Sequence, residues 1–150
     1  MKEKLLVSAC LLGENCKYSG GNNYTPAVEA LKEKFDVIPV CPEQLGGLPT
    51  PRTPSERAGD RVLTRSGADV TEAFRQGAEK TLEIARAGGA VRAVFQERSP
   101  SCGSGRIYDG TFSGTLVPGR GVTAELLEKH GIRVYGGEQI EALLDGTGGE

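Results

Sequence analysis

Short hydrophobic runs alternate with amphipathic stretches along the chain, and this pattern predicts strands that alternate with helices. Four runs are short enough to be buried strands, at residues 5–9, 36–40, 90–95 and 132–135. The helical stretches are 25–34, about 69–87 and 123–130, with a further turn or two expected in 138–144. This alternation favours a mostly parallel, Rossmann-like α/β sheet flanked by helices.

The segment from Pro42 to Gly67 has no periodicity of its own. It follows the second predicted strand and is rich in Gly, Pro and Arg. A connection of this length in a compact domain often carries function, so we expect a long Gly/Pro-rich loop there. No internal repeat or domain linker interrupts the chain, and residues 1–150 are therefore expected to form a single domain.

The charge balance argues against some classes of partner. The net charge is −2, with 18 Lys and Arg residues against 20 Asp and Glu, so no broad basic surface is available for long nucleic acids. No hydrophobic run approaches the length of a membrane span, and the N-terminal run is too short for a signal peptide. The sequence predicts a cytoplasmic protein that uses no membrane, and its thiols should stay reduced.

Four cysteines in a reducing compartment are more typical of a metal or redox site than of disulfides. Because His130 is the only histidine, any metal site must be rich in thiolates. Cys10, Cys41 and Cys102 each fall at or just after the carboxyl end of a different predicted strand. In parallel sheets these ends share one edge, where ligands bind, so we expect the three thiols to converge there.

From the residues alone, several interpretations of the cysteines stay open. They could be buried packing residues, or they could hold zinc in a binding module without catalysis. The close cysteine pairs of zinc ribbons are missing, and so is ferredoxin spacing. A thiol-redox protein could use Cys10 and Cys16, although their five-residue gap is unlike the usual redox pair. Zinc and iron–sulfur thus remain alternatives at this point.

Nine short motifs are spread over the whole chain. They are SACLLG (8–13), CKYSG (16–20), CPE (41–43), GGL (46–48), PRTPSE (51–56), GADVT (67–71), SPSCG (99–103), IYDG (107–110) and GRGVT (119–123). Their combination resembles the thiouracil desulfidase family. The resemblance implies a [4Fe–4S] cluster held by three cysteines with the fourth iron open, and non-redox desulfuration of thiolated uracils. The family commonly has Arg and Asp where this chain has Lys17 and Ser19.

The strand-end argument makes Cys10, Cys41 and Cys102 the expected metal ligands. Cys16 lies in the loop after Cys10. It could be a fourth ligand, a sulfur relay or a substrate contact, and of these roles a catalytic one is expected. Glu43 follows Cys41 by two residues and is the expected general base for the attacking water. Its alternative role is that of a carboxylate at a helix start or a partner for an arginine.

Three further polar residues are candidates. Ser101 is expected to bond the substrate or a cluster sulfur in catalysis, or otherwise to satisfy its own turn. Arg52 is expected to orient a substrate carbonyl, with a solvated loop charge as the alternative, and Ser8 is a second substrate-binding candidate. The expected partners are a small thiolated base or nucleoside, and a sulfide acceptor or iron–sulfur assembly proteins.

Overall fold

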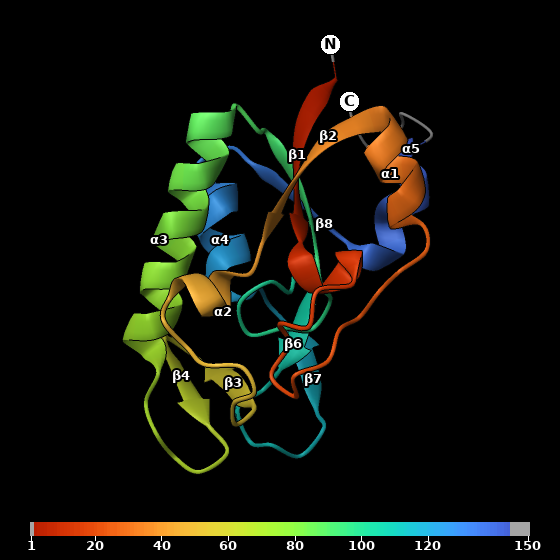
Figure 1. Ribbon diagram of the computed structural model, residues 1–150. Coiled ribbons are helices and arrows are strands. Elements are labelled where there is room, and N and C mark those ends of the chain that lie inside the picture. Colours follow the sequence, from red (N-terminus) through yellow and green to blue (C-terminus); the bar gives the residue numbers. More distant parts are fainter. Residues whose placement is uncertain (1, 145–150) are drawn as a thin grey trace.

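A computed structural model describes residues 2–144, and a four-stranded parallel sheet forms its centre (Figure 1). The order of the strands is β2-β1-β5-β8, so the first strand lies inside the sheet. Their bounds are Glu3–Ser8 for β1, Phe35–Val40 for β2, Arg92–Phe95 for β5 and Arg133–Gly136 for β8. The predicted parallel α/β architecture is confirmed.

Helices cover both faces of the sheet. Helices α1 (Val28–Lys34) and α5 (Ile140–Leu144) lie on one face, and α3 (Thr71–Gly88) and α4 (Val122–Lys129) lie on the other (Figure 1). Because successive side chains of a strand point to opposite faces, β1 supplies both cores. Leu5 and Val7 pack with α1 and α5, whereas Leu6 packs with the α3–α4 side.

The long segment after β2 contains short elements that the sequence pattern did not reveal. Helix α2 (Pro42–Leu45) follows β2 directly, and a hairpin of β3 (Ser55–Ala58) and β4 (Arg61–Thr64) comes next. A second hairpin pairs β6 (Arg106–Tyr108) with β7 (Leu116–Pro118). Elements of three or four residues are too short to show a period in the sequence.

Two glycines allow α2 to pack tightly against α3. A Cβ atom on Gly46 would lie 2.0 Å from the Ala73 carbonyl oxygen, and one on Gly77 would lie 2.0 Å from the Pro42 carbonyl oxygen. No side chain fits at either position without moving a backbone. This contact fixes the place of α2, the helix that carries Glu43.

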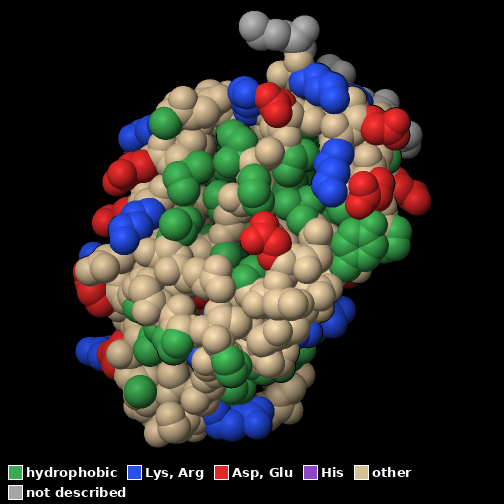
Figure 2. All heavy atoms as spheres, in the orientation of Figure 1, with side chains coloured by type: hydrophobic (Ala, Val, Ile, Leu, Met, Phe, Trp, Pro, Cys, Tyr) green, Lys and Arg blue, Asp and Glu red, His purple; other side chains and the backbone are tan. Residues whose placement is uncertain are grey.

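The surface is mixed in character. On the face drawn in Figure 2, hydrophobic side chains gather over the upper half, where β2 forms an edge of the sheet, and charged side chains lie mostly around the rim. Within residues 2–144, no helix is both long and apolar enough to cross a membrane.

Candidate active site

A cavity of about 630 Å³ opens at the carboxyl edge of the sheet, and all four cysteines line it. Cys10 lies in the 3₁₀ helix η1 (Ala9–Leu12) directly after β1, and Cys41 lies between β2 and α2. Cys102 lies in the loop after β5. The structure therefore brings the three strand-end cysteines to one site, as the topology predicts.

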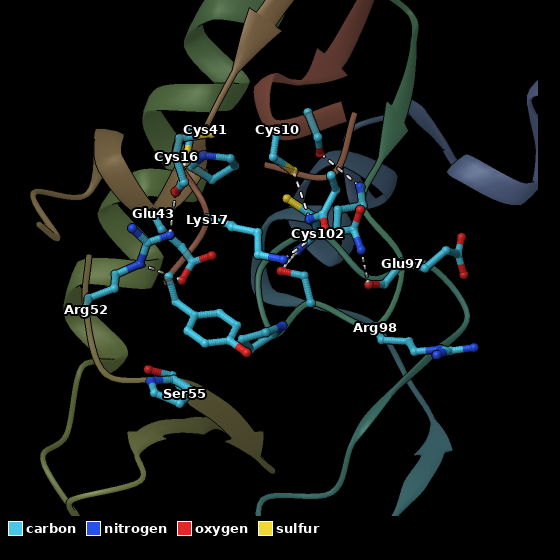
Figure 3. A pocket seen from close by; sticks show the side chains of 18 of the residues that line it. Cys10, Cys16, Lys17, Cys41, Glu43, Arg52, Ser55, Glu97, Arg98 and Cys102 are labelled. Carbon is cyan, nitrogen blue, oxygen red and sulfur yellow. Dashed lines mark hydrogen bonds and ion pairs between the residues drawn. The ribbon is translucent and has the colours of Figure 1, made fainter. Parts of the chain in front are cut away.

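Three of the thiols form one contact group. Cys16 contacts both Cys10 and Cys41 through its side chain, and Cys41 Sγ lies 3.8 Å from the Cys16 carbonyl oxygen. Cys102 is buried, and it lies close enough to Cys10 and Cys41 to interact with them electrostatically. Figure 3 shows the four side chains at the inner end of the cavity. No disulfide joins them, since all four are free thiols.

The four thiols differ in pKa because their environments differ. Contact with the Cys16 thiol lowers the pKa of Cys41 to about 7. The same kind of contact lowers the pKa of Cys10. Those two contacts raise the pKa of Cys16 itself. Burial raises the pKa of Cys102, although the adjacent Ser8 hydroxyl opposes this shift.

This donor set suits a soft metal cluster. Thiolates favour iron–sulfur clusters or zinc over hard cations, and three of them come from separate strand ends around one cavity. Within residues 2–144, no three His, Cys, Asp or Glu side chains are arranged to hold a single metal ion. Cys10, Cys41 and Cys102 are the residues that could hold a [4Fe–4S] cluster here.

Arg52 ties the cavity wall together. Its guanidinium donates to four acceptors: Glu43 Oε1 at 3.3 Å, the Cys16 carbonyl at 2.9 Å, the Pro49 carbonyl at 3.0 Å and Thr50 Oγ1 at 2.9 Å. The side chain is only 6% exposed, which excludes the solvated loop charge considered above. Four of the five N–H groups of an arginine are thus used by the protein itself.

Glu43 lies in the first turn of α2 and lines the same cavity. Its carboxylate forms an ion pair with Arg52 and keeps 20% of its side chain exposed. Both features expected for it, a place at a helix start and an arginine partner, are therefore present. Neither excludes work as a base, because part of the carboxylate still faces the cavity (Figure 3).

The two serines are placed differently. Ser8 lines the cavity; its Oγ accepts a hydrogen bond from the Gln96 backbone N–H at 2.9 Å. Ser101 is fully buried and does not line the cavity. Its Oγ lies 2.7 Å from Thr123 Oγ1 at the start of α4. The structure therefore does not place the Ser101 hydroxyl against a substrate.

Several cavity residues had no signal in the sequence. Asn23 donates to Cys10 Sγ at 3.6 Å, and no motif contains it. Arg98 and Phe112 line the outer cavity and both have positive φ, at 64° and 58°. Glu56 is part of a motif, and its carboxylate accepts from the backbone N–H groups of Gly110 and Phe112. That pair of bonds joins the two hairpins at the mouth.

The fold and the site define an α/β protein with a cysteine-lined cavity at the edge of its sheet. Residues 5–139 match the model of the 2-thiouracil desulfurase family, and the chain belongs to this family. The predicted family is thereby confirmed.

The chain is also similar to two further proteins. The chain is 41% identical over 150 residues to the uncharacterized protein YbbK of Bacillus subtilis (strain 168), with 93% of this chain and 99% of that protein covered. The solved structure of the [4Fe–4S]-dependent thiouracil desulfidase TudS is 47% identical, with a TM-score of 0.90 over 95% of each chain.

Proposed function

We propose that this protein is a [4Fe–4S]-dependent desulfidase that converts a thiolated nucleobase of the thiouracil type to its oxo form and releases sulfide. Family membership and the similarity to TudS support this function. In the chain itself, the observation that carries it is the meeting of four cysteines and a partly exposed carboxylate in one cavity. The zinc-binding and thiol-redox alternatives have no comparable support.

Cys10, Cys41 and Cys102 would hold the cluster. When bound, the cluster supplies an iron without a protein thiolate, a soft Lewis acid that polarises a thiocarbonyl group. Ser8 would help to position Cys102, because its hydroxyl bonds the Cys102 thiol and itself accepts a hydrogen bond from the Gln96 N–H.

Glu43 would take a proton from the water that attacks the thiocarbonyl carbon. Arg52 holds this carboxylate in place and fixes the Cys16 backbone at the same time. At most one N–H of its guanidinium then remains for a substrate oxygen. Cys16, whose side chain contacts both Cys10 and Cys41, would act in catalysis beside the departing sulfur.

We assign Ser101 a positioning role in place of a contact with substrate. Its hydroxyl bonds Thr123, and its backbone carbonyl accepts from the N–H groups of Thr123 and Ala124. These bonds anchor the loop that carries Cys102 to the start of α4. Loss of the Ser101 hydroxyl would therefore first disturb the position of Cys102, the neighbouring cluster ligand.

The direct test is turnover by the cluster-loaded protein under anaerobic conditions. Without added reductant, we expect 2- or 4-thiouracil to yield uracil and sulfide in equal amounts, with the new carbonyl oxygen derived from solvent water. A requirement for an electron donor during turnover would contradict the non-redox scheme. Failure of both substrates on a loaded protein would contradict the substrate class.

Glu43→Gln tests the base. The variant should keep its iron and acid-labile sulfide but lose roughly 10²–10⁴-fold in turnover, the usual contribution of a well-placed general base. Glu97→Gln is the matched control, because Glu97 lines the cavity but its side chain points away from the cysteines (Figure 3). Equal activity of the two variants would remove Glu43 from catalysis.

This function implies a cellular setting. We propose that residues 1–150 act as one desulfidase domain in a reducing cytoplasm, where the thiols stay available for a cluster. Iron–sulfur assembly proteins would load the site, and a sulfide acceptor would take the released sulfur.

A further inference from the structure

Asn23 contacts Cys10 in two independent ways. Its backbone N–H donates to the Cys10 carbonyl oxygen at 2.9 Å, and its side-chain Nδ2 lies 3.6 Å from Cys10 Sγ. The first contact belongs to the backbone and does not involve the side chain at position 23. A second backbone bond, from Thr25 to Leu11, holds the same loop against η1. Two backbone bonds thus hold the loop against η1 independently of the Asn23 side chain.

Lys17 determines which end of the Asn23 amide faces the sulfur. Its ammonium lies 3.2 Å from Asn23 Oδ1. An ammonium can only donate hydrogen bonds, so the amide must present its oxygen to Lys17 and its NH₂ to Cys10. The positive charge also polarises the amide and strengthens the N–H donor. Lys17, Asn23 and Cys10 thus form a directed chain that ends on a predicted ligand sulfur.

We propose that Asn23, oriented by Lys17, is a positioning residue that weakens electron donation from the Cys10 sulfur to the cluster. This inference rests on the proposed function, because it assumes a cluster bound through Cys10. An N–H···S bond withdraws density from a ligand sulfur, and such bonds are one of the factors that set the reduction potential of an iron–sulfur cluster. Weaker donation also leaves the iron a stronger Lewis acid.

The test is a spectroelectrochemical titration of the cluster-loaded protein under argon. Asn23→Ala should shift the midpoint potential to a more negative value than in the unmodified protein. Asn22→Ala is the matched control: Asn22 is exposed in the same loop, and its side chain bonds Asn15 Oδ1 and the Tyr24 N–H. It should leave the potential unchanged.

Substitutions at Lys17 test the orienting step. Lys17→Met removes the donor that fixes the amide and should shift the potential in the same direction as Asn23→Ala. Lys17→Arg keeps a donor-only cation and should retain the original value. Thiouracil turnover by the same samples should fall with the potential, several-fold in Asn23→Ala and little in Lys17→Arg.

Every other result would contradict either the proposed function or the inference about Asn23. An unmodified protein that binds no iron and acid-labile sulfide would contradict the proposed function itself. If it binds the cluster, but Asn23→Ala keeps the original potential or shifts it no more than Asn22→Ala does, the inference about Asn23 fails alone. Loss of the cluster from both Asn23→Ala and Lys17→Met would make Asn23 part of the scaffold and likewise refute the tuning role.

Discussion

Replacement of Arg52 should lower the free energy of unfolding, although the residue lies in an irregular segment. The structure shows why: the guanidinium is 6% exposed and links α2, the Cys16 loop and the turn at Pro49 and Thr50 through four hydrogen bonds. Arg52→Met keeps the length of the side chain and removes every one of these bonds. The buried acceptors then lose their donor and gain little water in return.

The size of the effect can be worked out from two of these acceptors. These are the Glu43 carboxylate, which is 20% exposed, and the carbonyl of the buried Cys16. An unsatisfied buried polar group costs about 1–3 kcal/mol, and more when it is charged. Partial hydration of Glu43 reduces its share, so we expect the free energy of unfolding to fall by about 2–4 kcal/mol in Arg52→Met. Arg52→Lys keeps the charge but not the planar fork, and about 1–2 kcal/mol should be lost.

Urea denaturation of reduced, chelator-treated protein, followed by far-UV circular dichroism, measures this difference without a contribution from bound metal. Arg75→Met is the matched control, since Arg75 pairs with Glu72 at 3.5 Å but the two side chains are 64% and 70% exposed. It should cost no more than about 0.5 kcal/mol. A loss below about 0.5 kcal/mol in Arg52→Met, or equal losses in the two methionine variants, would refute the argument from burial.

Two further predictions concern packing and pH. Alanine normally stabilises a helix interior relative to glycine by about 1 kcal/mol. Gly77→Ala should instead lower the free energy of unfolding by about 1–3 kcal/mol, because the new Cβ would meet the Pro42 carbonyl. Thermal melts measure this loss, and Gly105→Ala is the control because open space surrounds Gly105. The Arg57 side chain lowers the pKa of Glu125, so this pair stabilises the fold above the carboxyl's unfolded pKa and loses that contribution as the pH falls through the folded pKa. Glu125→Gln should therefore cost about 0.2–1 kcal/mol near pH 7, and urea titrations should show this difference disappearing in acid; a difference independent of pH would contradict the assignment to the ion pair.

The central sheet could be predicted from the sequence because strands β1, β5 and β8 are largely buried on both faces, and the edge strand β2 still carries a hydrophobic run. A strand of this kind appears as a continuous hydrophobic run, and the predicted runs at 5–9, 36–40, 90–95 and 132–135 each overlap an observed strand. The hairpins could not be predicted in this way. Strand β3 has the sequence SERA with every residue half-buried, so it shows no alternation of exposed and buried positions.

The cysteine positions could also be predicted, because strand order and strand ends depend only on the backbone path. The roles of the neighbouring side chains depend on rotamers and burial, which the sequence does not encode locally. Ser101 is next to Cys102 in the chain, yet its hydroxyl points to Thr123 at the start of α4. Asn23 is thirteen residues from Cys10, and only the fold of the intervening loop brings its amide to the sulfur.

The choice of arginine at position 52 has a chemical reason beyond stability. The proposed base, Glu43, and Cys16 come from different segments of the chain. A base is effective only when it is held at a fixed, short distance from the reacting atoms. Arg52 bonds Glu43 through Nε and the Cys16 carbonyl through a terminal nitrogen, so one rigid plane fixes both groups. A lysine would supply the same charge on a flexible stem and could not hold two such acceptors in a set geometry. In the proposed function, the buried guanidinium thus sets the position of the Glu43 carboxylate relative to the Cys16 backbone before any substrate enters.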